Sequence, residues 1–181
     1  AADMYRTAQS MLVGAGYEHY EVSNYAVPGR HSRHNKVYWA NKAFWGFGMG
    51  ATSFVGGQRF ARVKKLEQYQ AWVAQGSPQP PATTGSAAVD VSVDNDVDDL
   101  LDTIMLGMRL AEGICLDELG ARFGEGVVST LERVTAPHER TGWVAIQEDA
   151  SNGKRYMRFV DPEGFLFQNT VLVEIFAALS Q

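Results

Sequence analysis

The sequence predicts an α/β segment followed by a small helical domain that contains one β-hairpin. Residues 2–13 place apolar side chains at helical spacing and end at Gly14 and Gly16, after which residues 17–23 alternate as a strand does. A helix, a tight glycine turn and a strand form half of an α/β unit. Residues 1–75 are too few to complete such a layer, so we expect the chain to start inside a larger protein.

Composition and charge divide the chain into three segments. Residues 1–75 carry nine basic and four acidic residues, whereas residues 98–181 carry seven basic and fourteen acidic residues. Between them, residues 76–97 are rich in Gly, Ser, Pro and Thr, which is typical of a linker or a long surface loop. We therefore predict two domains, residues 1–75 and 98–181, joined by a poorly ordered linker over residues 76–97.

The third segment predicts a winged-helix-like domain of mixed α+β type. Asn152-Gly153 is a turn signal between two alternating stretches, which predicts a β-hairpin. Apolar periodicity predicts helices on both sides of this hairpin, over residues 97–110, 116–123, 127–134 and 167–179. The segment is strongly acidic, and binding to phosphates requires the opposite sign. We therefore expect no nucleic-acid partner, and we interpret the domain as structural or protein-facing.

Composition also limits the compartment. Hydrophobic residues make up 45% of the chain and charged residues 20%, which is ordinary for a globular protein. No apolar run approaches the ~18 residues of a membrane span, and the opening residues lead us to expect no secretory leader. Cys115 is the only cysteine, which excludes an internal disulfide framework and fits a reducing compartment. We expect a cytoplasmic protein, or one of a chloroplast or mitochondrion if the source is eukaryotic.

Residues 17–65 carry the strongest functional signal. From Val22 to Leu66 there is no Asp or Glu but eight Lys or Arg, although the whole chain has a net charge of −5. Inside this window the basic, histidine-bearing residues 30–36 run into Tyr38 and Trp39. A loop-rich, aromatic and cationic surface suits a flat or anionic ligand.

Several stretches resemble radical SAM proteins related to oxygen-independent coproporphyrinogen III oxidase, in the same order and spacing. They are Tyr20–Ala26, Pro28-Gly29, Arg33–Trp39, Gly46–Ser53, Arg59-Phe60 and Asp161–Leu166. The HNxxYW pattern from His34 to Trp39 resembles the heme-chaperone (HemW-type) branch more than the oxidase. The resemblance covers nearly the whole chain outside the predicted linker.

The resemblance implies a fold and a function. Residues 1–75 would be the C-terminal part of a radical SAM partial (β/α) barrel, followed by the winged-helix-like domain. The protein would bind heme or porphyrin and pass it to heme-accepting proteins. The alternative is an oxygen-independent coproporphyrinogen III oxidase, which decarboxylates porphyrinogen propionates by radical chemistry, and a third option is an inactive fragment. Whether the chain is an enzyme stays open.

The resemblance also implies cofactors. The family holds a [4Fe–4S] cluster on a CxxxCxxC motif, and the cluster anchors S-adenosylmethionine. Three thiolates are the minimum for such a site, so Cys115 alone predicts no cluster in this chain. Ala51 and Thr52, at the end of the last barrel strand, would contact S-adenosylmethionine, mostly through their backbone.

The implied heme site centres on His34, whose imidazole would ligate the heme iron. Tyr38 and Trp39 would pack on the macrocycle, and Arg33 would meet a propionate, with Arg30 and Lys36 as further candidates.

Each candidate also has a plainer interpretation. His34 can be a structural histidine that bonds the turn backbone. His31 and His19 lie nearby, but no carboxylate or thiol joins them in the sequence, which disfavours a zinc site. The glycines of residues 46–50 are typical of a tightly packed strand rather than a dinucleotide fingerprint. Cys115 has an apolar setting and is expected to be a buried, inert thiol.

Overall fold

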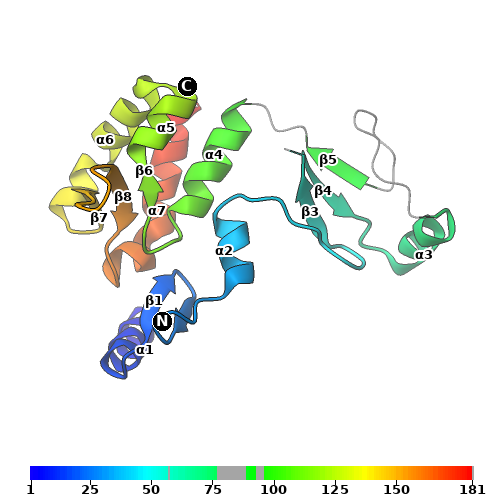
Figure 1. Cartoon of the computed structure of the whole chain (residues 1–181), viewed down its shortest axis with the longest axis horizontal. Helices are drawn as coiled ribbons and strands as arrows, with labels where there is room; N and C mark the ends of the chain where they lie inside the picture. The colour runs from blue at the N-terminus through cyan, green and yellow to red at the C-terminus, as the bar shows by residue number, and fades with distance from the viewer. Residues whose placement is uncertain (57, 77–88, 93–95, 181) are drawn as a thin grey trace. The chain divides into compact units, whose positions relative to one another are not determined.

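The computed structural model describes residues 1–56, 58–76, 89–92 and 96–180 (Figure 1). The chain forms two compact units, of which the first joins Ala1–Ala40 to Leu100–Gln181 and the second is Asn41–Asp99. The compact units therefore differ from the predicted segments, because the first forty residues belong with the C-terminal domain. Most of the predicted linker, residues 77–88 and 93–95, lies outside the described residues.

The first forty residues contain two helices and a short hairpin. The predicted N-terminal helix is confirmed as α1, and the strand predicted over residues 17–23 is shorter because the chain turns at Val22-Ser23. A helix that the sequence analysis did not predict follows the hairpin. The elements are α1 (Ala2–Gly14), β1 (Glu18–Glu21), β2 (Asn24–Ala26), antiparallel to β1, and α2 (Arg33–Trp39).

The winged-helix-like domain is confirmed in its helices and its hairpin. Its elements are α4 (Asp96–Gly107), β6 (Ile114–Cys115), α5 (Leu116–Phe123), α6 (Glu125–Arg140), β7 (Val144–Glu148), β8 (Arg155–Phe159) and α7 (Glu163–Leu179). The short strand β6 was not predicted, and it completes an antiparallel sheet in the order β6-β8-β7. Figure 1 shows the helices packed around this sheet.

One apolar core fills this domain. Leu100 and Ile104 in α4 and Met108 directly after it recur every four residues and are buried, so one face of that helix packs into the core. Met157 in the central strand β8 is fully buried. The buried cluster consists of Leu100, Ile104, Met108, Ile114, Leu116, Leu119, Val128, Leu131, Val144, Met157, Phe159, Phe165, Val171, Leu172 and Ile175.

The second unit is a three-stranded antiparallel sheet with one helix. Its elements are β3 (Thr52–Val55), β4 (Gln58–Arg62), α3 (Leu66–Ala74) and β5 (Val89–Ser92), with the strand order β3-β4-β5. The strand expected around the glycines of residues 46–50 does not form: Phe44 makes a single bridge to Phe54, and Gly48 has a φ of 95°, which ends extended backbone.

Strand β5 corrects part of the predicted linker. Residues Val89–Ser92 alternate apolar and polar side chains in the sequence, and their backbone pairs with Arg59–Arg62 of β4. The pairing partner lies about thirty residues upstream, which composition alone does not reveal. None of the helices in the described part of the chain has the length and apolar character needed to cross a membrane.

Gly113 provides a test of this fold. Its φ is 75°, and a Cβ there would overlap the carbonyl oxygen of Met157. We expect Gly113→Ala to lower the free energy of unfolding by about 1–3 kcal/mol or more. Alanine there would have to adopt a left-handed backbone conformation, and its Cβ would also clash with backbone. Urea unfolding followed by circular dichroism measures this change.

Gly126 is the matched control for Gly113. It lies in α6, and a Cβ there meets no atom within 4 Å. Gly126→Ala should leave the urea midpoint unchanged or raise it, because alanine favours a helix. Equal midpoints for the two alanine variants would contradict the fold described for this domain.

Candidate functional site

Strand β1 continues its pairing onto the loop that follows α4. The Val22 amide donates to the Arg109 carbonyl at 2.9 Å, and the Ala111 amide donates to the Tyr20 carbonyl at 3.1 Å. Between these two bonds, Glu21 and Leu110 form an antiparallel bridge. The N-terminal hairpin is therefore joined by its backbone to the winged-helix-like domain.

Helix α1 is also tied to this domain, near the start of α7. Arg6 Nε donates to Glu163 Oε1 at 2.6 Å, and Gln9 Nε2 donates to Asp161 Oδ2 at 2.8 Å. The hydrogen bond from Arg6 holds the pKa of the Glu163 carboxyl below its usual value. These side-chain bonds fix α1 on the same domain that β1 joins through its backbone.

His19 lies in a buried cluster between the hairpin and α7. Its side chain is 3% exposed, and Nδ1 lies 2.9 Å from Asp161 Oδ2. The ring stacks on Tyr25 at 4.0 Å and meets the edge of Phe165 at 5.1 Å. Burial, with a smaller contribution from the Asp161 charge, raises the pKa of Tyr25 to about 12. The His19 side chain is thus largely buried among these residues.

Helix α2 presents one face to the loop after α4. Lys36 Nζ donates to Glu112 Oε1 at 2.8 Å. Three residues further on, the Trp39 ring lies beneath the Arg109 guanidinium, 5.4 Å from Arg109 Cζ to the ring centroid. Figure 1 shows α2 beside the C-terminal end of α4. Arg109 and Glu112 were not identified in the sequence, since only the folded chain brings them to α2.

The opposite face of α2 carries the predicted heme ligand. His34 is exposed, and its ring meets Tyr38 edge-to-face at 4.7 Å and 86°. Arg33 is exposed next to it. Ser32 precedes the helix, and its Oγ accepts a hydrogen bond from the Asn35 amide at 3.3 Å. An accessible imidazole, a phenol ring and a guanidinium therefore come from one short helix.

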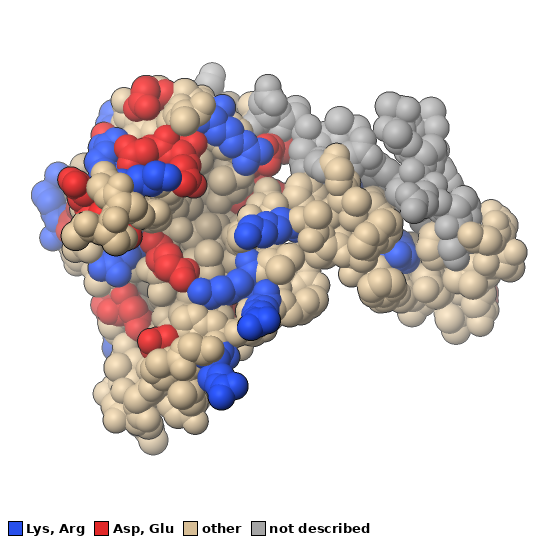
Figure 2. All heavy atoms as spheres, viewed as in Figure 1, with Lys and Arg blue, Asp and Glu red and all other residues tan. Residues whose placement is uncertain are grey.

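The charge around α2 matches the sequence pattern. In the space-filling view, Lys and Arg side chains gather around α2 and the segment before it (Figure 2). Over the winged-helix-like domain, Asp and Glu side chains are interspersed with basic ones. The basic surface around α2 therefore suits an anionic ligand.

His31 does not join His34 in a metal site. Its Nε2 lies 2.6 Å from Glu18 Oε2, and its ring stacks on Tyr20 at 4.5 Å. Within the described ranges, no group of three or more His, Cys, Asp or Glu side chains is arranged to hold a metal ion. His31 is thus held on the hairpin by Glu18 and Tyr20.

Ala51 and Thr52 belong to the second unit. The Arg62 amide donates to the Ala51 carbonyl at 2.9 Å, and Thr52 begins β3 with an exposed side chain. A Cβ on Gly46 would overlap the Thr52 carbonyl, so the expected close backbone approach is confirmed there. These two residues belong to the second unit, whereas α2 belongs to the first.

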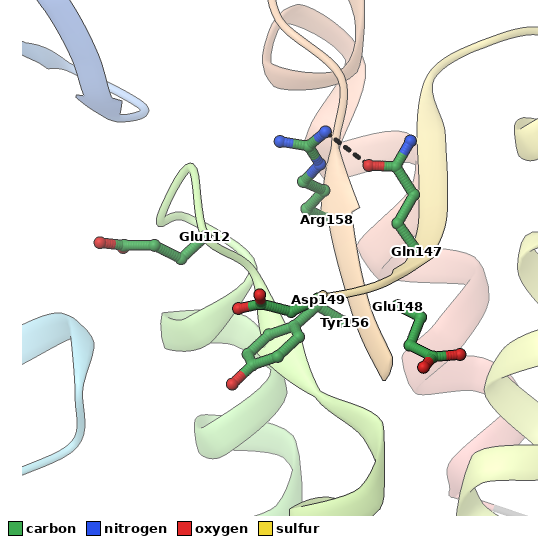
Figure 3. Close-up of a pocket in the computed structure, with 6 residues that line it drawn as sticks. All are labelled: Glu112, Gln147, Glu148, Asp149, Tyr156 and Arg158. Carbon is green, nitrogen blue, oxygen red and sulfur yellow. Dashed lines mark hydrogen bonds between the residues drawn. The ribbon is translucent and has the colours of Figure 1, made fainter. Parts of the chain in front are cut away.

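Two pockets open on the first unit. One, of about 540 Å³, includes Tyr17, Glu18, His19 and His31 in its lining. The other, of about 400 Å³, lies at the hairpin β7-β8 (Figure 3). It contains three carboxylates, those of Glu112, Glu148 and Asp149, together with Arg158, which donates to Gln147 at 2.8 Å. An acidic lining of this kind does not favour a phosphate ligand.

Comparison with known proteins places these features in a family. Residues 96–150 match the HemN C-terminal domain. The heme chaperone HemW of Synechocystis sp. is 33% identical over 195 residues, which cover all of this chain and 45% of that protein. The heme chaperone HemW of Mycobacterium tuberculosis is 35% identical over 130 residues, which cover 72% of this chain and 31% of that protein.

A solved structure shows the same fold. Coproporphyrinogen III oxidase (HemN) from Escherichia coli, a radical SAM enzyme, matches with a TM-score of 0.65 over 98% of this chain and 40% of that chain, at 15% identity. The chain spans less than half the length of the curated relatives it matches. It belongs to the HemN-like radical SAM family of coproporphyrinogen III oxidase-like proteins, on the branch of the proteins named heme chaperone HemW.

Proposed function

We propose that this chain takes part in a heme chaperone, which binds heme or porphyrin and passes it to heme-accepting proteins. The observation that carries the proposal is the exposed imidazole of His34 within the HNxxYW pattern. The relatives with the same branch name support it. The predicted cytoplasmic or organellar location belongs to the same proposal.

The side chains on the outer face of α2 fit a heme. A neutral imidazole at His34 supplies an axial nitrogen for the iron. Tyr38 lies one turn further along the helix and offers an aromatic edge to the macrocycle. Arg33 is exposed and can form a charge-assisted bond with a propionate. Heme itself supplies the iron and the flat apolar surface that these residues would hold.

Trp39 and Lys36 have other contacts in this proposal. Trp39 lies beneath Arg109, and Lys36 pairs with Glu112. Both side chains therefore hold α2 against the loop after α4. The predicted stacking of Trp39 on the macrocycle, and the predicted bond from Lys36 to a propionate, stay predictions.

The cluster that the family implies does not fit this chain. A [4Fe–4S] cluster takes three thiolates in this family, and Cys115 is a single, half-buried thiol in the winged-helix-like domain. Contacts from Ala51 and Thr52 to S-adenosylmethionine stay a proposal about the longer proteins of the family.

The oxidase alternative is less supported, because the likeness to the oxidase rests on the fold at 15% identity.

Heme titration of the chain tests the ligand. His34→Ala should abolish or shift the Soret band of the complex, because it removes the axial nitrogen. Arg33→Ala should weaken binding and leave the Soret position unchanged, because it removes a charge partner and not the ligand. Absorbance across the Soret band follows both changes.

His31→Ala is the matched control, because His31 is three residues away and is already paired with Glu18. It should leave the spectrum of the complex close to that of the unchanged chain. If the His34→Ala variant binds heme with an unchanged spectrum, His34 is not the ligand and the proposed heme site is wrong.

A further inference from the structure

We infer that Arg109 and Glu112, from the winged-helix-like domain, are positioning residues that set the rotation of α2 and so direct His34 outward. This inference rests on the proposed function of α2. It gives the acidic C-terminal domain a role in ligand binding without any direct contact between that domain and the ligand.

Helical geometry separates the two faces of α2. Successive residues rotate by about 100°, so Lys36 and Trp39 share one side, whereas His34 and Tyr38 share a side about 150° away. The first pair contacts the loop after α4, and the rings of the second pair meet edge-to-face, with His34 exposed and Tyr38 half-buried. Any rotation of α2 that breaks the inner contacts therefore also turns His34 away from its present direction.

Arg109 makes two contacts at the same point of the fold. Its carbonyl accepts the Val22 amide, and its guanidinium covers the Trp39 ring. Its Nε is buried and has no hydrogen-bond acceptor among the described residues, so the ring face of Trp39 is the electron-rich surface that it meets. The residue thus links β1 to the last turn of α2.

Glu112 adds a second contact one turn earlier on the helix. The Lys36–Glu112 pair is partly exposed, and a pair of this kind contributes little stability by itself. Its effect is geometric, because contacts at Lys36 and Trp39 together fix both the position and the rotation of the helix axis. Gly113, with a φ of 75°, turns the chain directly after Glu112.

Helix α2 depends on such contacts because it has only seven residues. Isolated helices of this length do not persist in water, so tertiary contacts must hold it.

The alternative is that Lys36 or Arg109 meets a propionate directly and has no positioning role. The two possibilities predict different results when charges are exchanged.

The experiment is a charge exchange across the Lys36–Glu112 pair, with heme affinity and Soret position as readouts. Lys36→Glu and Glu112→Lys should each weaken heme binding by about fivefold, and the double variant should recover affinity to within about twofold of the unchanged chain. The Soret position should stay constant in all three, because His34 remains the ligand. A double variant as weak as Lys36→Glu would overturn the positioning role of Glu112.

Arg109→Ala should weaken heme binding by about tenfold, and Arg109→Lys should restore part of the loss. Arg122→Ala is the matched control, because Arg122 also covers an aromatic ring, that of Phe123, but lies on α5. It should leave heme affinity unchanged. Equal affinities for Arg109→Ala and Arg122→Ala would overturn the role of Arg109.

A measurement without heme keeps the two proposals distinguishable. In NMR spectra of the heme-free chain, Arg109→Ala should shift the backbone amide signals of residues 33–40, and Arg122→Ala should not. Should the unchanged chain show no His34-dependent Soret band, the proposed function fails, and these amide shifts still decide whether Arg109 positions α2. Unmoved signals in Arg109→Ala would overturn the inference by themselves.

Discussion

The backbone pairing of β1 with residues 109–111 is the constraint on which the first unit depends. It joins segments about ninety residues apart, and it satisfies amides and carbonyls of a short strand that would otherwise face solvent or the interior unpaired. Tyr5 and Val22 pack against the core of the winged-helix-like domain, so the pairing is covered by apolar contacts. The first forty residues and the C-terminal domain consequently form one compact unit.

The same pairing determines what α2 can do. Because Arg109 lies in the paired loop, its guanidinium reaches the last turn of α2, and Glu112 reaches the turn before it. The helix is held by its inner face, and His34 and Tyr38 are left on its outer face. The acidic domain would therefore influence the proposed heme site without contacting the heme, because it holds the helix that carries the ligand.

Local patterns in the sequence predicted the helices and hairpin of the winged-helix-like domain, because helical periodicity and turn signals are local features. His34 was identified because it lies in a basic, histidine-bearing stretch, which is also a local feature. Helix α2 was missed because its basic, aromatic residues show no apolar periodicity. Arg109 and Glu112 were missed because their partners on α2 lie at least seventy residues away in the sequence. Strand β5 was missed because a Gly-, Ser- and Pro-rich composition hides a pairing partner in β4.

Native-state amide hydrogen exchange of Val22 and Ala111 tests the central claim most directly. If β1 and the loop after α4 form one cooperative structure, these two amides exchange slowly and with similar opening free energies, close to that of the core strand residue Met157. If Val22 and Ala111 exchange as fast as an exposed loop while Met157 stays protected, the pairing does not hold the hairpin to the domain. Arg109 and Glu112 would then not hold α2 in a fixed orientation.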